Sequence, residues 1–420
     1  MLVSYCMLSV CIYHSIHSLS FLGGSYGYVR CALGPLTGYM VGFCESVEYI
    51  MYVAASVAVF GDVVPLMTGA SHEYAPIYWL IFYVIGFVTI VPGGQLFWQF
   101  SNYQAILCLL LILMYCFGGM SETNFEKYDS YFIGGGKSFM EFYPVAAWFY
   151  VGVEAMTLSC EDIADAGKKV PRAIMACVGT LFITCQLVYF VSVSLAPGSL
   201  ALAAEIFPFD PAFIHIFHVN KMGAAFLALP QIFSTSFGFM FAFGRQLYSM
   251  SKSGLFPAVM SKTYGKYETP YMGLLIGSII SFTALLILFY TVPLFGAKIF
   301  NICMLGSCSV YIALARAYIV CYDRYSNLER HYKSPLGKWA AYYVMGVFGL
   351  MMVGLAFYQK DDYLSITAFV ILSIFAIIYY FAVAQKREFF SEEEQEKFMK
   401  AYILNGKLYI VLYYIFQYFT

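Results

Sequence analysis

The chain has 420 residues, of which 61% are hydrophobic and only 11% are charged, and its formal net charge is -1. A soluble domain is usually about half apolar and about a quarter charged, so this composition excludes an ordinary soluble enzyme and a disordered chain. The lack of a basic excess argues against a nucleic-acid partner, because there is no surplus of cations to meet phosphates. The composition predicts an all-α polytopic membrane protein.

A membrane-spanning helix needs about 20 mainly apolar residues. Eleven segments fit this description: 1–19, 36–60, 76–91, 103–117, 142–158, 173–195, 223–249, 272–290, 297–320, 339–358 and 364–384. Pro92, Gly93 and Gly94 separate the third segment from the fourth, and both of these are short. The apolar runs are too long and too uniform for the alternating strands of a β-barrel.

The 23 Lys and Arg residues, counted in the loops and near the segment ends, divide 18 to 5 between the two sides of the membrane. The richer side, which includes Arg30, Arg245 and the C-terminus, is predicted to be cytoplasmic. Eleven spans then place the N-terminus outside, although residue 1 already lies in an apolar run. We therefore expect a first span to be missing from the chain. Residues 386–420 are predicted to form a cytoplasmic tail whose apolar end is too short to cross the membrane.

The segment 142–158 combines a glycine with an acidic residue, Gly152 and Glu154, in the middle of an apolar run. Glycine weakens a helix, and a carboxyl group in the membrane is costly and usually functional. One interpretation is a helix that breaks at Gly152 to Glu154 and offers free backbone groups to a substrate or ion. The other is a packing glycine beside a buried, paired glutamate. The pattern by itself leaves both open.

Glu45 and Glu48 lie three residues apart inside the segment 36–60. This spacing puts both carboxyl groups on one helix face. They could bind an ammonium group or relay a proton, and the alternative is a structural pair bonded to neighbouring helices. We expect a functional role for at least one of them.

No pattern in the sequence indicates an enzyme, a metal site or a cofactor. The twelve cysteines are scattered through apolar runs without metal-ligand spacing, so we interpret them as small packing residues. A Ser-His-Asp order, an HExxH motif and a CxxC motif are all absent from the sequence.

Three further stretches in chain order form a recognisable pattern. The first covers residues 21–35, the second residues 149–172 and the third residues 244–257, followed by Thr269 and Pro270. The first holds Gly23, Gly24 and Arg30, the second holds Gly152, Glu154 and Asp162, and the third holds Arg245, Gly254 and Pro257. Together they resemble the amino acid–polyamine–organocation superfamily of permeases. Within that superfamily, the sequence around Glu45, Glu48 and the second stretch is most similar to ethanolamine-permease-type members.

The resemblance implies a LeuT-like fold of two inverted five-helix repeats plus two helices. The transporter domain would cover residues 1–385, with an incomplete first repeat at 1–117, a second repeat at 142–320 and extra helices at 339–384. The segment 142–158 would then be the sixth helix, and the missing span would be the first. The resemblance also implies coupling to protons or substrate exchange, without a cofactor.

The first hypothesis is therefore a secondary transporter in the plasma membrane, which moves amino acids or related small amines by alternating access. Gly152, Val153, Glu154 and Ala155 would supply the substrate site, Phe149 and Tyr150 would line or gate it, and Glu45 or Glu48 would pair with the amine or a coupling proton. The second hypothesis is a truncated or degenerate membrane protein that does not transport, such as a sensor or an accessory subunit. The sequence leaves the oligomeric state open.

Overall fold

The computed structural model describes residues 2–18, 24–128, 134–163, 165–196, 198, 209–292, 295–324, 334 and 336–390, without the side chains of residues 2, 13–18 and 161. These residues are almost entirely helical, and the one β-bridge among them joins Tyr264 to Thr269. The α-helices are α1 (Leu2–Ser18), α2 (Ser25–Leu33), α3 (Pro35–Thr68), α4 (Ala75–Ile90), α5 (Gly94–Gly119), α6 (Phe125–Tyr128), α7 (Gly135–Phe142), α8 (Ala166–Ser194), α10 (Asp210–Phe217), α11 (Lys221–Lys252), α12 (Tyr271–Thr291), α13 (Phe295–Arg324), α14 (Lys338–Phe357) and α15 (Leu364–Ala382). The 3-10 helices are η1 (His72–Tyr74), η2 (Met120–Glu122), η3 (Val145–Tyr150), η4 (Glu154–Asp162), η5 (Ala258–Ser261) and η6 (Ala384–Lys386).

Nine helices in the described part of the chain are long and apolar enough to cross a membrane. Each coincides with one of the expected segments, so the all-helical polytopic fold class is confirmed. The other two expected segments differ from a simple span. Segment 1–19 forms the 17-residue helix α1, whose apolar part is short, and segment 142–158 is not a continuous helix.

Several helices are longer than the hydropathy pattern predicts, α3 and α5 by the most. Helix α3 continues through Pro65 to Thr68, and α5 begins at Gly94 rather than at residue 103. Polar residues such as Gln95 and Asn102 ended the apolar run but do not end the helix. The physical reason is that intrahelical hydrogen bonds extend into the interface, where polar side chains reach water.

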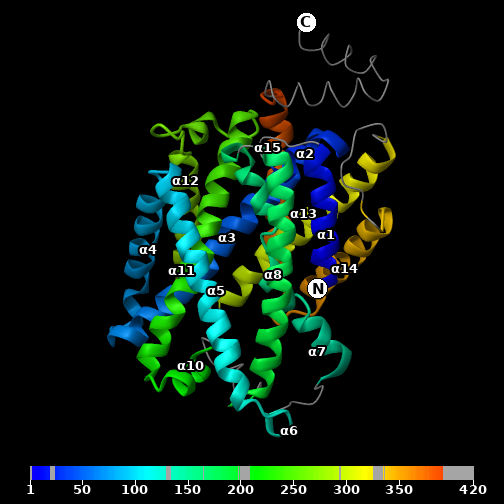
Figure 1. Ribbon diagram of the computed structural model, residues 1–420. Helices are drawn as coiled ribbons and strands as arrows, with labels where there is room; N and C mark the ends of the chain where they lie inside the picture. The colour runs from blue at the N-terminus through cyan, green and yellow to red at the C-terminus, as the bar shows by residue number, and fades with distance from the viewer. Residues whose placement is uncertain are drawn as a thin grey trace, which may run out of the picture.

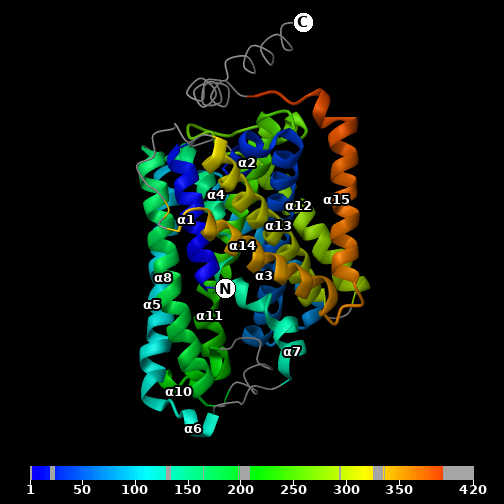
Figure 2. The same ribbon diagram turned by 90° about the vertical axis from the view of Figure 1, so that its right-hand side faces the viewer.

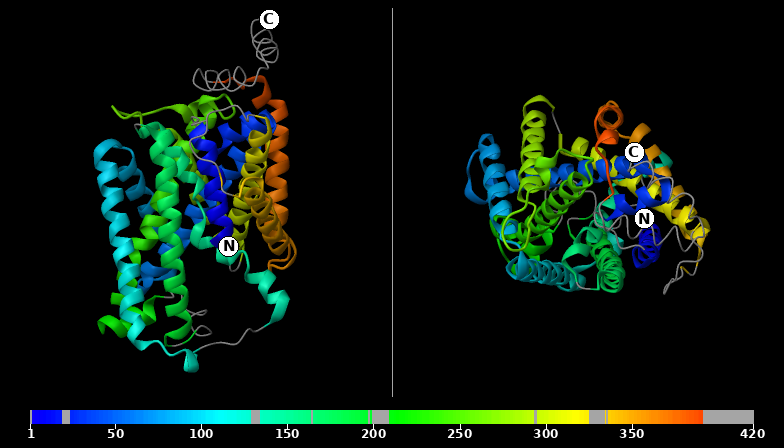
Figure 3. Two further views of the ribbon diagram at one scale, coloured as in Figure 1. Left: turned by 45° about the vertical axis from the view of Figure 1, so that its right-hand side comes forward. Right: turned by 90° about the horizontal axis from the view of Figure 1, so that it is seen from above.

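Helix α3 runs obliquely through the middle of the molecule, while α4 and α14 lie on opposite sides of it (Figures 1 and 3). It packs mainly against α11 and α13. Helix α13 is buried along most of its length, whereas α15 stands at the edge and exposes most of its surface (Figure 2). The exposed side chains of the outer helices are large and apolar, as expected for contact with lipid.

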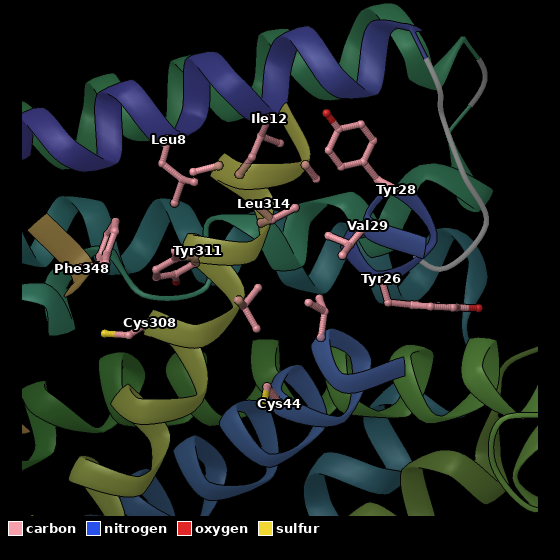
Figure 4. Packing of buried hydrophobic residues seen from close by; sticks show 14 of the residues in the cluster. Leu8, Ile12, Tyr26, Tyr28, Val29, Cys44, Cys308, Tyr311, Leu314 and Phe348 are labelled. Atoms are coloured by element: carbon pink, nitrogen blue, oxygen red, sulfur yellow. The ribbon is translucent and has the colours of Figure 1, made fainter. Parts of the chain in front are cut away.

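Small side chains allow the central helices to approach closely. The buried face of α13 carries Gly306, Ser307, Cys308 and Ala315, and such residues favour close packing of membrane helices. Leu8 and Ile12 of α1 lie over this helix (Figure 4). All twelve cysteines are buried or partly buried, as expected of packing residues.

Two large clusters of buried side chains make up most of the core. One gathers residues of α1, α2, α13 and α14, and the other gathers residues of α3, α4, α11 and α12. A polar contact holds the second cluster together, because Tyr83 of α4 shares a hydrogen bond with Ser281 of α12 at 2.6 Å, and Ser281 donates to the Ile50 carbonyl of α3. The division into two repeats stays a prediction, and most of the predicted tail, residues 391–420, lies outside the described residues.

Candidate functional site

The segment between α7 and α8 is a discontinuous helix. It consists of η3 and η4, separated by residues 151–153. Gly152 at the break has φ 89°, and a Cβ atom there would collide with the ring of Phe239. Both the conformation and the close approach require glycine. The Gly152 N–H donates to the Tyr311 hydroxyl at 3.3 Å, so a side chain of α13 takes up a backbone group that the break leaves free.

Glu45 and Glu48 lie on the buried part of α3, and Tyr49 and Tyr52 continue the same face at helical spacing. Glu154 begins η4, directly after the break. All three carboxyl groups are almost completely buried, with exposed fractions of 1%, 0% and 0% for Glu45, Glu48 and Glu154. The structure therefore brings together the acidic residues that the sequence singled out in two separate segments.

The three carboxyl groups differ in their partners. Glu154 accepts a hydrogen bond from the Tyr49 hydroxyl at 3.0 Å, and Glu45 accepts one from the Gln246 amide at 2.8 Å. Glu48 interacts electrostatically with Glu154 and lies beside Ser307, yet neither of its oxygens has a hydrogen-bond partner of good geometry among the described residues. One oxygen of Glu154 and the amide oxygen of Gln246 are likewise buried without a hydrogen bond of good geometry among the described residues.

Burial of a polar oxygen without a partner costs free energy, and burial of an unpaired charge costs more. None of the three carboxyl groups forms an ion pair within the described chain. A cluster of this kind favours the arrival of a proton or a positively charged group. No set of three His, Cys, Asp or Glu side chains in the described ranges is arranged to hold a metal ion.

Aromatic rings border the same place. Tyr52 stacks on Trp148 with ring centroids 4.1 Å apart, and Phe239 lies 4.1 Å from Tyr52 and 5.6 Å from Tyr49. We call Tyr49, Tyr52, Trp148 and Phe239 the aromatic wall. It covers the break, since Phe239 also rests on Gly152. Carboxyl groups beside aromatic faces suit an ammonium group, which is attracted to both.

The remaining predicted residues divide between the two core clusters. Val153 belongs to the core cluster that contains α1, and Ala155 packs against the cluster that contains α4, α11 and α12. The break therefore lies between the two clusters. The Tyr150 ring stacks on Tyr5 of α1 at 5.2 Å, and Phe149 packs next to Tyr150 on that side. Both are therefore placed against α1 rather than in the aromatic wall.

Sequence reasoning missed several residues that complete this arrangement. Tyr49 and Tyr52 could have been found, because they repeat the spacing of Glu45 and Glu48 on one face. Gln246, Tyr311 and Phe239 had no such signal, since they come from α11 and α13, far along the chain.

The fold and this site define a multi-span membrane protein with a discontinuous helix and buried carboxyl groups at its centre, features typical of secondary transporters. The family model described as "Amino acid permease" matches residues 1–395, and the chain belongs to this family.

Similar characterised proteins are transporters. The chain is 20% identical to the methylthioribose transporter of Bacillus subtilis (strain 168), over 79% of this chain and 74% of that protein. It is 19% identical to the branched-chain amino acid permease BcaP of the same organism, over 74% and 70%. It is 23% identical to the D-serine/D-alanine/glycine transporter of Escherichia coli (strain K12), over 79% and 73%.

Among solved structures, Mhp1, a nucleobase-cation-symport-1 family transporter in a closed conformation, is similar to the chain with a TM-score of 0.44 and 15% identity. That match covers 94% of this chain and 87% of that one. The family and the similar transporters support secondary transport across a membrane, and they give no support to the non-transporting alternative.

Proposed function

We propose that the protein carries a small amino acid or a related amine by alternating access, with the ammonium group bound between the buried carboxyl groups and the aromatic wall. The observation that carries this proposal is Glu154. It follows the break directly, accepts a hydrogen bond from Tyr49 on one oxygen, and has no hydrogen bond of good geometry on the other among the described residues. An ammonium group would satisfy that oxygen and stack against Trp148 or Phe239.

The free backbone groups of residues 152–155 would bind the remaining polar atoms of the substrate. Membership of the amino acid permease family supports an amino-acid-like substrate, and the acidic centre supports its amine end. The resemblance to ethanolamine-permease-type members adds small amines without a carboxylate to the candidates. Phe149 and Tyr150 would act as a gate on the α1 side, where they already pack against Tyr5.

Glu45 and Glu48 receive different roles in this proposal. Glu45 is held by Gln246 and keeps α3 and α11 in register. Glu48 has no such partner in the described chain and interacts with Glu154, so it is the better carrier of a coupling proton. Proton coupling or substrate exchange needs no cofactor. The excess of Lys and Arg near the C-terminus supports a cytoplasmic C-terminus, and we place the protein in the plasma membrane.

Uptake into proteoliposomes tests the proposal. Radiolabelled alanine, leucine, lysine, glutamate and ethanolamine are offered with and without an inward proton gradient. At least one should accumulate, and Glu154→Gln should reduce that uptake by about tenfold or more, because one charged hydrogen bond is lost. Glu73→Gln, which changes an exposed glutamate in η1, is the matched control and should transport normally. Failure of all five compounds in correctly folded protein would contradict the proposal.

A further inference from the structure

The segment after α15 crosses one end of the molecule and reaches α2. Figure 2 shows residues 384–390 running from the top of α15 toward α2. We call this region, where α2, the last turn of α11 and the last turn of α15 meet, the α2 end. The segment is not part of the central site, and its contacts have no role in the function proposed above.

Arg30 of α2 binds this segment in three ways. Its Nη1 and Nη2 atoms each donate to the Phe389 carbonyl at 3.3 Å, and Nη2 lies 3.6 Å from a carboxyl oxygen of Glu388. The guanidinium group also stacks over the Phe390 ring, 4.0 Å from its centroid. The planar guanidinium can make these contacts simultaneously, which a lysine could not.

The sequence had counted Arg30 among the cytoplasmic loop charges. The structure adds that the residue is only 2% exposed and that its side chain is completely covered, while the side of the membrane on which it lies stays a prediction. A buried arginine is tolerated only where hydrogen bonds and an opposite charge replace water. Residues 388–390 supply part of that replacement, so the docking of the segment contributes to the burial of Arg30.

The segment also docks on the end of α11. The Phe389 N–H donates to the Ser253 carbonyl at 3.2 Å. The Arg387 carbonyl packs on Gly254, which has φ 72°, and a Cβ atom at Gly254 would collide with that carbonyl. Close packing of one backbone on another here depends on glycine.

A tyrosine of α2 links this helix directly to the end of α11. The Tyr26 hydroxyl lies 2.9 Å from the Ser253 hydroxyl and donates to the Ser249 carbonyl. Helix α2, the end of α11 and residues 384–390 therefore contact one another in pairs. Helix α2 also carries Ser25, which lies beside Glu45 of the carboxyl cluster. A nine-residue helix thus connects the α2 end to the centre of the molecule.

We propose that residues 384–390 are a strap that holds the α2 end closed and must detach before α2 separates from the end of α11. The strap is an autoinhibitory contact built into the chain itself. Its use as a gate depends on the alternating access proposed above, whereas its docking and release do not.

Hydrogen exchange measured by mass spectrometry on the purified full chain in lipid nanodiscs, without any substrate, tests the strap. Gly254→Ala places a Cβ against the Arg387 carbonyl and should detach the strap. Gly265→Ala is the matched control, because Gly265 has the same φ of 72° with open space around it. Gly254→Ala should speed amide exchange by about tenfold in peptides covering both 384–390 and 25–33, and Gly265→Ala should leave both unchanged.

Arg30→Lys provides a second variant that strains no backbone. Lysine keeps the charge but loses the paired hydrogen bonds to residue 389 and the stacking on residue 390. Arg30→Lys should therefore also speed amide exchange in peptides covering 384–390 and 25–33. Equal exchange in Gly254→Ala and Gly265→Ala would overturn the docking. Faster exchange in 384–390 alone, with α2 unchanged, would overturn the gating role. Because no substrate is added, the exchange experiment tests the docking and release of the strap even if the transport proposal fails.

Discussion

The centre of the molecule and its α2 end bury charged groups in opposite ways. At the α2 end, Arg30 meets Glu388, and nearby Asp162 binds one guanidinium nitrogen of Arg245 through both carboxyl oxygens, at 2.8 and 2.6 Å. At the centre, Glu45, Glu48 and Glu154 are gathered without an ion-pair partner among the described residues. The difference is that a buried charge is offset where its contact holds helices together; in the function proposed above, the substrate would supply the missing positive charge at the centre.

The largest expected effect concerns the shape of the centre. Gly152→Ala should abolish uptake almost completely and destabilise the fold by about 1–3 kcal/mol, because alanine is strained at φ 89° and its Cβ meets Phe239. The measurement is proteoliposome uptake together with thermal unfolding in detergent. Gly179→Ala, in open space on α8, is the control and should be neutral in both. Normal uptake by Gly152→Ala would show that the break is not needed for transport.

The second prediction concerns a paired charge. Arg245→Gln should lower the free energy of unfolding by about 2–3 kcal/mol, because Asp162 would lose its charged partner in a partly buried position. Lys338→Gln removes one partner of the far more exposed pair with Asp323 and should cost much less. Thermal unfolding of both variants measures the difference. Equal losses would mean that burial does not distinguish the two pairs.

The third prediction concerns an unmatched charge and has the opposite sign. Glu48→Gln should leave the unfolding temperature unchanged or raise it by a few degrees, because the amide keeps the shape and removes a buried acidic group that lacks a good partner. Uptake should fall, and its dependence on a proton gradient should disappear. A clear drop in the unfolding temperature would instead assign Glu48 a structural role, and the contrast between centre and end would be lost.

The smallest effect is a pH dependence at the strap. Burial raises the pKa of the Glu388 carboxyl, while Arg30 and the Tyr380 hydroxyl act to lower it, and burial dominates. A carboxyl whose folded pKa lies above its unfolded value binds its proton more tightly in the folded state, so stability falls as pH rises from about 4.5 through the folded pKa.

Glu388→Gln should remove this slope, and Arg387→Gln, a change at the neighbouring exposed side chain, should keep it. Unfolding temperatures measured from pH 4.5 to pH 8 compare the two variants with the unaltered chain. A slope that survives Glu388→Gln would assign the titration to another group.

The sequence by itself determined the class of fold and the acidic candidates. Apolar runs of membrane length require helices, because each buried backbone group must be hydrogen-bonded within its own segment. For the same reason nine expected spans fall on nine long helices of the described chain. Gly152 followed by Glu154 offered a broken helix as one of two interpretations, and the structure has the glycine, at φ 89°, at a break.

Only the tertiary structure decided which groups meet. Glu154 faces α3, Gln246 reaches Glu45 from α11, and Tyr150 turns toward α1, although nothing in their local sequence distinguishes these directions. Arg30 shows the limit most clearly, since its burial depends in part on a contact with Phe389, 359 positions later in the chain. Local patterns fix the hydrogen bonds within each helix, whereas the pairing of side chains between helices depends on packing across the whole chain.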